Sequence, residues 1–270
     1  MTEHTAHAGP GEAGRLVCCD LDGVIWRGDT PIPGSAAAIE RLRAAGRRVV
    51  FVTNNSSLRV ADYVQRLARF DISVEPDDVC TSAQAAAALV GNGLAPGASV
   101  LACAGAGVVE ALEALGLRVV SGGPVEAVVV GFHRDFDFEG LTRASDAARG
   151  GARFVATNLD PTYPIDGGLV PGAGALAAAV ATAAGRAPEV AGKPERPMAE
   201  LVRARYGHEG LVVGDRPSTD GAFAETLGWP FALVLSGVAG SPGGEPVPVP
   251  PPPFVASDLA RLVPLLLNGG

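Results

Sequence analysis

Short runs of Val, Ile, Leu and Cys alternate along the chain with longer stretches rich in Ala, Leu and Arg. The short runs are continuously apolar, which is typical of strands buried on both faces of a parallel sheet. The longer stretches have the length and spacing of helices, so the order predicts an α/β fold. The predicted strands are 16–19, 48–53, 100–104, 127–131, 154–157, 210–214 and 231–235, and the predicted helices are 35–45, 59–70, 83–90, 108–115, 140–149, 173–184, 196–205 and 220–227.

The two ends of the chain depart from this alternation. Residues 1–14 are polar and contain glycine, which predicts a flexible tail. The stretch 246–253 is rich in proline, so it can form neither a helix nor a central strand. We expect it to be an extended surface connection before a last short helix near 258–267.

Two acidic residues follow the first apolar run. Because side chains alternate along a strand, Asp20 and Asp22 are expected to point the same way. Two neighbouring carboxylates repel each other, and a fold tolerates them mainly when a cation or a proton lies between them. Gly23 then allows the backbone to turn away. An ordinary acidic turn is the alternative for this segment taken alone.

Three further segments place polar groups at predicted strand ends or just before a helix. Thr53-Asn54-Asn55-Ser56 follows the second strand, and Asp215 to Asp220 follows the strand 210–214. Lys193, the only lysine of the chain, precedes a predicted helix. Singly, these segments could be a polar turn, a helix cap and a helix start with a solvated lysine. In an open parallel sheet, however, ligands bind at the carboxyl ends of the strands.

Together these groups fit a phosphate monoester and a divalent metal ion. Several carboxylates that meet near one point need a hard cation, and an all-oxygen set of ligands suits Mg²⁺. The Thr53 hydroxyl, the Asn54 amide and the Lys193 ammonium can donate to phosphoryl oxygens. A carboxylate can also act as a covalent nucleophile.

Composition narrows the classes of function. The 270 residues are 47% hydrophobic and 19% charged, enough for one large or two modest domains with apolar cores. The net charge of −8 argues against a nucleic-acid or anionic-membrane partner. No apolar stretch has membrane-spanning length and the first residues lack a signal-peptide core, so we expect a cytoplasmic protein. The four cysteines show no CxxC spacing, which favours buried free thiols.

The ordered motifs resemble those of the haloacid dehalogenase superfamily of aspartate-nucleophile phosphatases. The resemblance rests on DLDGV at 20–24, TNNS at 53–56, GKP at 192–194 and GDRPSTD at 214–220. Within this superfamily, the sequence most resembles the branch whose members carry an inserted cap. That branch includes NagD-type, phosphoglycolate, glycerol-3-phosphate and 4-nitrophenyl phosphatases. Cap-like segments are GFHRDF at 131–136, ATNLD at 156–160 and PGAG at 171–174.

The resemblance implies a Rossmann-like, parallel-sheet core with an inserted α/β cap domain. The implied boundaries are a tail over 1–14, a core over 15–85 and 188–267, and a cap over 86–187. Such a cap closes over the site and selects the substrate. The resemblance also suggests a homodimer formed through the cap.

The resemblance further implies roles for single residues. Asp20 attacks phosphorus, and Asp22 protonates the leaving alcohol and then activates water. Thr53 and Asn54 bind phosphoryl oxygens, and Lys193 holds the nucleophile and the phosphate together.

The implied magnesium ligands are the Asp20 side chain, the Asp22 main-chain carbonyl and Asp215, with Asp220 close by, directly or through water. Gly221 departs from the β-branched apolar residue usual after the last aspartate, and Pro217 stiffens the same loop. In the cap, Asn158 and Asp160 either face the leaving group or brace their loop.

The predicted function is therefore magnesium-dependent hydrolysis of a small phosphorylated metabolite, with glycerol phosphate or a phosphoglycolate-like molecule favoured over nucleotide monophosphates. Two other classes of function remain open on the same scaffold. One is a catalytically silent sensor that binds phosphate or a metabolite. The other is a phosphotransferase that passes the phosphoryl group to an acceptor other than water.

Overall fold

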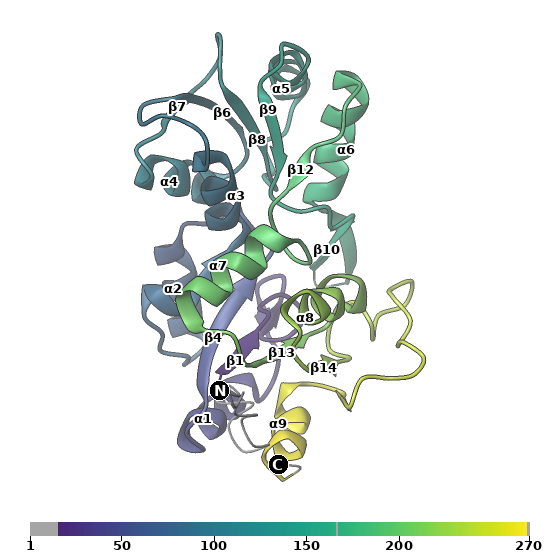
Figure 1. Cartoon of the computed structure of the whole chain (residues 1–270). Coiled ribbons are helices and arrows are strands. Elements are labelled where there is room, and N and C mark those ends of the chain that lie inside the picture. Colours follow the sequence, from purple (N-terminus) through teal and green to yellow (C-terminus); the bar gives the residue numbers. More distant parts are fainter. Residues whose placement is uncertain (1–15, 166, 269–270) are drawn as a thin grey trace, which may run out of the picture.

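Two parallel sheets organise the molecule, the larger below and the smaller above in Figure 1. The computed structural model describes residues 16–165 and 167–268, so the predicted tail over 1–14 lies outside the described residues. The larger sheet has the order β15-β14-β13-β1-β4-β5, with every neighbouring pair parallel. Its strands are β1 (Leu16–Cys19), β4 (Arg48–Thr53), β5 (Val79–Thr81), β13 (Leu211–Gly214), β14 (Phe231–Val234) and β15 (Phe254–Ala256).

Helices cover both faces of this sheet, as the continuous apolar runs predicted. On β1, Val17 and Cys19 join one apolar cluster while Leu16 and Cys18 join another. The first cluster also takes in α1 (Ser35–Ala44), α2 (Val60–Arg69) and α9 (Leu259–Asn268). The second takes in α3 (Ser82–Gly91), α7 (Arg196–Tyr206) and α8 (Ala222–Leu227).

The smaller sheet has the order β12-β9-β8-β6-β7 and is also parallel throughout. Its strands are β6 (Ser99–Cys103), β7 (Arg118–Val120), β8 (Ala127–Val130), β9 (Arg153–Ala156) and β12 (Glu189–Val190). One face packs on α5 (Phe138–Arg149) and α6 (Ala173–Ala184), and the other on α4 (Ala106–Ala114). This inserted block is the cap domain.

The exact domain boundaries remain our proposal: a cap over 86–187 and a core over 15–85 and 188–267. The smaller sheet reaches just past the proposed cap, because β12 pairs with β9. One apolar cluster runs through both domains, since residues of α3, α4 and α7 belong to it together. This packing sets the cap beside the carboxyl ends of the larger sheet's strands.

Several short elements were not predicted because they are too short to show a periodic pattern. The hairpin of β10 (Thr162–Ile165) and β11 (Gly168–Pro171) and the smaller hairpin of β2 (Trp26–Arg27) and β3 (Thr30–Pro31) matter most for the site. A 3₁₀ turn covers Pro76–Asp78, and a single π turn covers Pro217–Gly221.

Other expectations can be compared directly with the structure. Residues 246–253 form neither helix nor strand, and a helix follows them, as expected. All four cysteines are buried and free. Over the described part of the chain, none of the helices combines the length and the apolar character needed to cross a membrane.

Candidate active site

Three neighbouring strands of the larger sheet end at one place. β1 lies between β4 and β13, so Asp20, Thr53 and Asp215 come together at the carboxyl edge of the sheet. Asp20 continues the strand for one residue, because its N–H donates to Val213 O at 2.9 Å. This is the position where open α/β sheets bind ligands, and the strand pattern predicted it.

Glycines allow the acidic groups to approach the backbone closely. Gly23 has a φ of +86°, and a Cβ there would lie 2.3 Å from Asp215 Oδ2. At Gly214, a Cβ would lie 2.2 Å from the Asp220 carboxyl carbon. A side chain at either position would displace a carboxylate, so both glycines are required by the site.

Lys193 reaches the site from the smaller sheet, whereas Asp20, Thr53 and Asp215 come from the larger one. It follows β12, which belongs to the cap sheet, and therefore does not stand at a strand end of the larger sheet. Its ammonium is buried and donates to Asp20 Oδ1 at 2.6 Å, Asp220 Oδ1 at 2.7 Å and Val52 O at 2.8 Å. These three bonds use all three N–H donors of the lysine.

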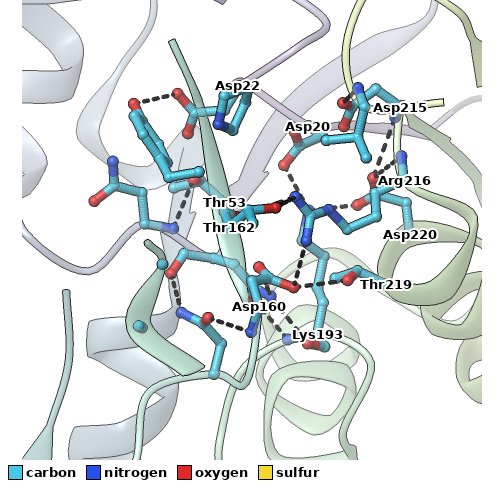
Figure 2. A pocket seen from close by; sticks show the side chains of 18 of the residues that line it. Asp20, Asp22, Thr53, Asp160, Thr162, Lys193, Asp215, Arg216, Thr219 and Asp220 are labelled. Atoms are coloured by element: carbon cyan, nitrogen blue, oxygen red, sulfur yellow. Dashed lines mark hydrogen bonds and ion pairs between the residues drawn. The ribbon is translucent and has the colours of Figure 1, made fainter. Parts of the chain in front are cut away.

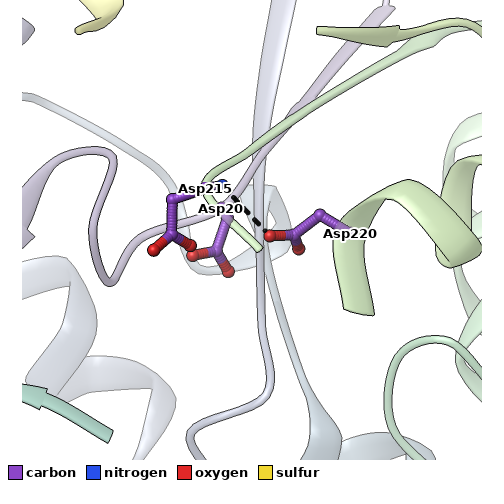
Figure 3. Close-up of side chains that lie close together, drawn as sticks. All are labelled: Asp20, Asp215 and Asp220. Carbon is purple, nitrogen blue, oxygen red and sulfur yellow. Dashed lines mark hydrogen bonds between the residues drawn. The ribbon is translucent and has the colours of Figure 1, made fainter. Parts of the chain in front are cut away.

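Asp20, Asp215 and Asp220 form a buried acidic cluster (Figure 3), with one oxygen of each carboxylate within 4.8 Å of the others. Burial and then the neighbouring carboxylate of Asp220 raise the pKa of Asp215 to about 7. Burial also raises the pKa of Asp20 well above its ordinary value, although Lys193 opposes this shift. The cluster is therefore unfavourable without a further cation.

The donor set fits a hard divalent cation. Three carboxylates against one ammonium leave two negative charges uncompensated among these four buried groups. All the side-chain ligand atoms are oxygens, which Mg²⁺ prefers, and none is the sulfur or imidazole typical of zinc. The residues present are thus suited to a magnesium ion beside Asp20.

The turn after β13 places Asp220 despite its unusual sequence. Asp220 Oδ2 accepts from the N–H groups of Asp215 and Arg216 at 3.2 and 3.1 Å, inside the single π turn. The Phe231 ring lies against Gly221, 3.3 Å from where a Cβ would be. A side chain at this position would therefore require the ring to move by a few tenths of an ångström.

Asp22 lies on the other side of the pocket from the acidic cluster (Figure 2). Its Oδ1 accepts two hydrogen bonds, from the Trp26 indole at 2.7 Å and from the Tyr163 hydroxyl at 2.8 Å. Burial raises the pKa of Asp22, and these two hydrogen bonds partly offset the rise. Tyr163 comes from β10 of the cap and stacks on Phe132, with ring centroids 5.4 Å apart.

Thr53 and Asn54 both line the pocket, but only the Thr53 side chain has a hydrogen-bond donor left for a ligand. Thr53 Oγ1 accepts from the N–H of Asn55 at 3.0 Å, which leaves its own hydroxyl hydrogen to donate. The Asn54 side chain is occupied, because Nδ2 donates to Asp160 and to Lys193 O, and Oδ1 accepts from Lys193 N. Asn54 therefore holds the lysine loop in place.

The cap residues singled out in the sequence fasten the cap loop to the core. Asn158 Nδ2 donates to Asn54 O at 2.6 Å, and Asn158 Oδ1 accepts from Asp160 N at 3.0 Å. Asp160 accepts from Asn54 and from Thr219 Oγ1, and Arg216 Nη1 lies 3.9 Å from its Oδ1. Their contacts are those of a brace, and their contact with a leaving group remains a prediction.

The pocket enclosed by these groups is small. Its free volume is about 50 Å³, and its walls come from both the core and the cap. Arg216, which is buried, closes one side by donating to the main-chain and side-chain oxygens of Thr162 in the cap. A site of this size admits a phosphoryl group with a small substituent.

The residues of the site that were not predicted include Trp26, Tyr163, Arg216 and Thr219. Arg216 and Thr219 lie inside the GDRPSTD motif, so their position next to Asp215 in the sequence could have identified them as residues of the site. Tyr163 had no such signal, because 141 residues separate it from Asp22.

Comparison with known proteins agrees with this site. A model of haloacid dehalogenase-like hydrolases matches residues 17–118, and a second, HAD-hydrolase-like model matches 190–262. D-glycerol 3-phosphate phosphatase of Mycobacterium tuberculosis is 38% identical over 247 residues, covering 90% of this chain and 69% of that protein. Human chronophin is 37% identical over 243 residues, covering 83% and 81%.

Two solved structures that this chain resembles are also phosphatases. The glycerol phosphate phosphatase of M. tuberculosis in complex with magnesium has a TM-score of 0.82 at 35% identity and covers 93% of this chain and 77% of its own. The p-nitrophenyl phosphatase of Archaeoglobus fulgidus has a TM-score of 0.81 at 30% identity, with 93% and 98% covered. The chain therefore belongs to the haloacid dehalogenase superfamily, in its NagD-like branch, and is a capped phosphatase of that type.

Proposed function

We propose that this protein hydrolyses the phosphate monoester of a small metabolite, with glycerol phosphate or a phosphoglycolate-like molecule as substrate. The observation that carries the proposal is the Asp20 carboxylate, aimed into a pocket of about 50 Å³ and held at 2.6 Å by the Lys193 ammonium. Relatives that act on glycerol phosphate support the substrate class. The small pocket disfavours nucleotide monophosphates.

The first half of the reaction follows from the two aspartates. A carboxylate oxygen of Asp20 forms a bond to phosphorus while the bond from phosphorus to the leaving oxygen breaks. Asp22 gives its proton to that oxygen, so the alcohol leaves neutral. The Thr53 hydroxyl donates to a phosphoryl oxygen, and Asn54, whose side chain is engaged, contributes through its main-chain N–H. The Lys193 ammonium, whose three N–H donors are engaged, acts through its charge and neutralises the phosphoryl oxygens from its place beside Asp20.

The second half returns the protein to its starting state. Asp22, now a carboxylate, takes a proton from a water molecule, whose oxygen forms a bond to phosphorus as the aspartyl bond breaks. The Trp26 indole and the Tyr163 hydroxyl hold Asp22 Oδ1 and so orient this carboxyl in both halves. Inorganic phosphate and free Asp20 result.

Asp20, Asp215 and the Asp22 main-chain carbonyl would hold the magnesium ion, with Asp220 close by. When bound, the ion neutralises charge on the phosphoryl oxygens and on the nucleophile. Asp220 keeps its own role without the ion, because its Oδ1 fixes the Lys193 ammonium at 2.7 Å.

The function is tested by release of inorganic phosphate from glycerol 3-phosphate, phosphoglycolate and nucleotide monophosphates, with Mg²⁺ present. We expect release from the first two at rates at least tenfold above the nucleotides. Absence of release from every substrate would favour a silent sensor. Loss of substrate without free phosphate, with an added alcohol phosphorylated instead, would indicate a phosphotransferase.

Removal of the metal is expected to lower phosphate release by at least about a hundredfold, because charge stabilisation at the phosphoryl group contributes several kcal/mol. The measurement compares the protein treated with EDTA, before and after Mg²⁺ is added back in excess. Calcium serves as the control cation, since it takes the same oxygen ligands with looser geometry. Full activity in EDTA would rule out the proposed metal.

Tyr163→Phe keeps the ring that stacks on Phe132 but removes the hydroxyl that donates to Asp22. A hydrogen bond of this kind contributes about 1–1.5 kcal/mol, so we expect kcat to fall about tenfold with KM changed by less than about twofold. The matched control is Tyr206→Phe, whose hydroxyl donates to Asp77 O away from the pocket. Equal kcat values for the two variants would show that Tyr163 does not orient Asp22.

We also propose a cytoplasmic homodimer that contacts neither nucleic acid nor membrane. Four buried free cysteines are typical of a reducing compartment, and the charge of −8 disfavours polyanionic partners. Pairing through the cap is supported by the family resemblance. The mass of the protein in solution tests the dimer.

A further inference from the structure

A second cavity of about 880 Å³ lies outside the catalytic pocket, and we call it the outer basin. Asn55, Phe132 and Tyr163 line both cavities, so the two are neighbours with the stacked rings of Phe132 and Tyr163 between them. The remaining lining of the outer basin includes Arg66, Arg69, Arg134, Asp29 and Asp62.

The outer basin lies on the side of the site where the leaving group departs. Tyr163 donates to Asp22, and so does Trp26, whose ring carries the Arg66 guanidinium 4.3 Å above its centre. Arg66 in turn lines the basin. The proposed general acid, Asp22, is thus separated from the basin by Tyr163 on one route and by Trp26 and then Arg66 on the other, whereas no residue of the acidic cluster lines the basin.

The charged side chains of the outer basin differ in whether they have an ion-pair partner. Asp29 pairs with Arg66 at 3.3 Å, whereas Asp62 accepts from the main-chain N–H of Arg59 at 3.1 Å and keeps its charge. The three guanidiniums and two carboxylates that line the basin give it a formal charge of +1. Arg69 and Arg134 are exposed, and among the described residues neither takes part in an ion pair with a carboxylate. Two free guanidiniums therefore face solvent here, on a chain with a net charge of −8.

We propose that the outer basin is the entrance for the substrate, and that Arg69 and Arg134 draw the phosphate dianion toward the gate formed by Phe132 and Tyr163. This inference rests on the proposed phosphatase function. A local positive field on an acidic protein concentrates anions at one opening and repels them elsewhere, which raises the rate of association. Such attraction acts through solvent, so salt screens it.

The test is the double variant Arg69→Glu, Arg134→Glu, assayed with glycerol 3-phosphate over a range of ionic strength. We expect kcat/KM to fall at least about tenfold at about 0.02 M salt, with kcat unchanged within about twofold. The difference from the wild type should shrink to less than about threefold at about 0.3 M salt. The control is Arg41→Glu, Arg261→Glu, which changes net charge equally on exposed parts of α1 and α9, far from the cap (Figure 1).

A binding measurement separates failure of this inference from failure of the proposed function. In the Asp20→Asn background, association of glycerol 3-phosphate is followed by the fluorescence of Trp26, with Trp229 buried against His208 as a constant background. One outcome is that the wild type turns over the substrate while the Arg69→Glu, Arg134→Glu variant and the Arg41→Glu, Arg261→Glu control show the same association rate and the same dependence on salt. That result overturns the proposed entrance and leaves the phosphatase function standing. Absence of both turnover and binding in the wild type overturns both proposals.

Discussion

Asp20→Asn is expected to abolish phosphate release, with a loss of at least about 10⁴-fold, as found for removal of covalent nucleophiles in other enzymes. The amide has nearly the shape of the carboxylate but cannot form the aspartyl-phosphate. Asn can still accept from Lys193, which now donates to Asp20 Oδ1 at 2.6 Å. Release of phosphate by purified variant and wild type, under saturating Mg²⁺, measures the loss.

The fold of this variant should be intact, which makes the loss of activity interpretable. Burial raises the pKa of Asp20, so at neutral pH its charged form is held at a cost in free energy of folding. Replacement by a neutral group removes that cost and lessens repulsion within the acidic cluster. We expect a melting temperature equal to or above that of the wild type. The matched control is Asp71→Asn, which makes the same change of side chain at an exposed position, and we expect its activity to equal that of the wild type. Residual activity above about 1% would overturn the assignment of the nucleophile.

The helices of the larger sheet and four of its six strands could be predicted, because these strands are apolar on both faces. The other two, β5 and β15, have three residues each and are too short to show a pattern. Val17 and Leu16 enter different apolar clusters, so no polar position interrupts the run. Asp20 and Asp215 could then be placed together, since the carboxyl ends of neighbouring parallel strands share an edge. For these strands, the local sequence predicts both the strand and the edge of the sheet at which its polar residue lies.

The parts that could not be predicted depend on contacts between distant segments. β12 has two residues, too few for a pattern, yet it decides that Lys193 arrives from the cap sheet. The hydroxyl of Tyr163 meets Asp22 only because a hairpin of the cap folds over the core. The Asn54 side chain, expected to face phosphate, bonds instead with the loops that carry Asp160 and Lys193. Pairings of this kind follow from the tertiary fold and leave no local signal.

Lys193→Arg keeps the positive charge and is nevertheless expected to lower kcat by about a thousandfold. The ammonium is a point charge that contacts Asp20, Asp220 and Val52 O at 2.6–2.8 Å, and only 3% of the surface of Lys193 is exposed. A planar guanidinium is larger and presents its donors in a fixed fork, so it cannot satisfy these three acceptors without displacing Asp20. A displacement of about 1 Å at the nucleophile costs about a hundredfold or more in rate.

Lys193→Met separates the charge of this residue from its shape, because methionine has similar length and no charge. Burial alone lowers the pKa of Lys193, but Asp20 and Asp220 outweigh it and raise that pKa above the ordinary value. The lysine is thus charged at every assay pH, and its removal leaves the acidic cluster uncompensated. Loss of one partner of a buried ion pair costs about 3–5 kcal/mol, so the melting temperature should fall by about 10 °C in EDTA.

Mg²⁺ should restore part of that stability, because a cation that binds the folded state alone raises its stability by mass action. The melting temperature of Lys193→Met is therefore expected to rise more on addition of Mg²⁺ than that of the wild type, while phosphate release stays at least about a thousandfold below it. Arg41→Met on the exposed surface of α1 provides the control for removal of a cation. Activity of Lys193→Arg within twofold of the wild type, or an unchanged melting temperature for Lys193→Met, would show that the lysine does not compensate the acidic cluster.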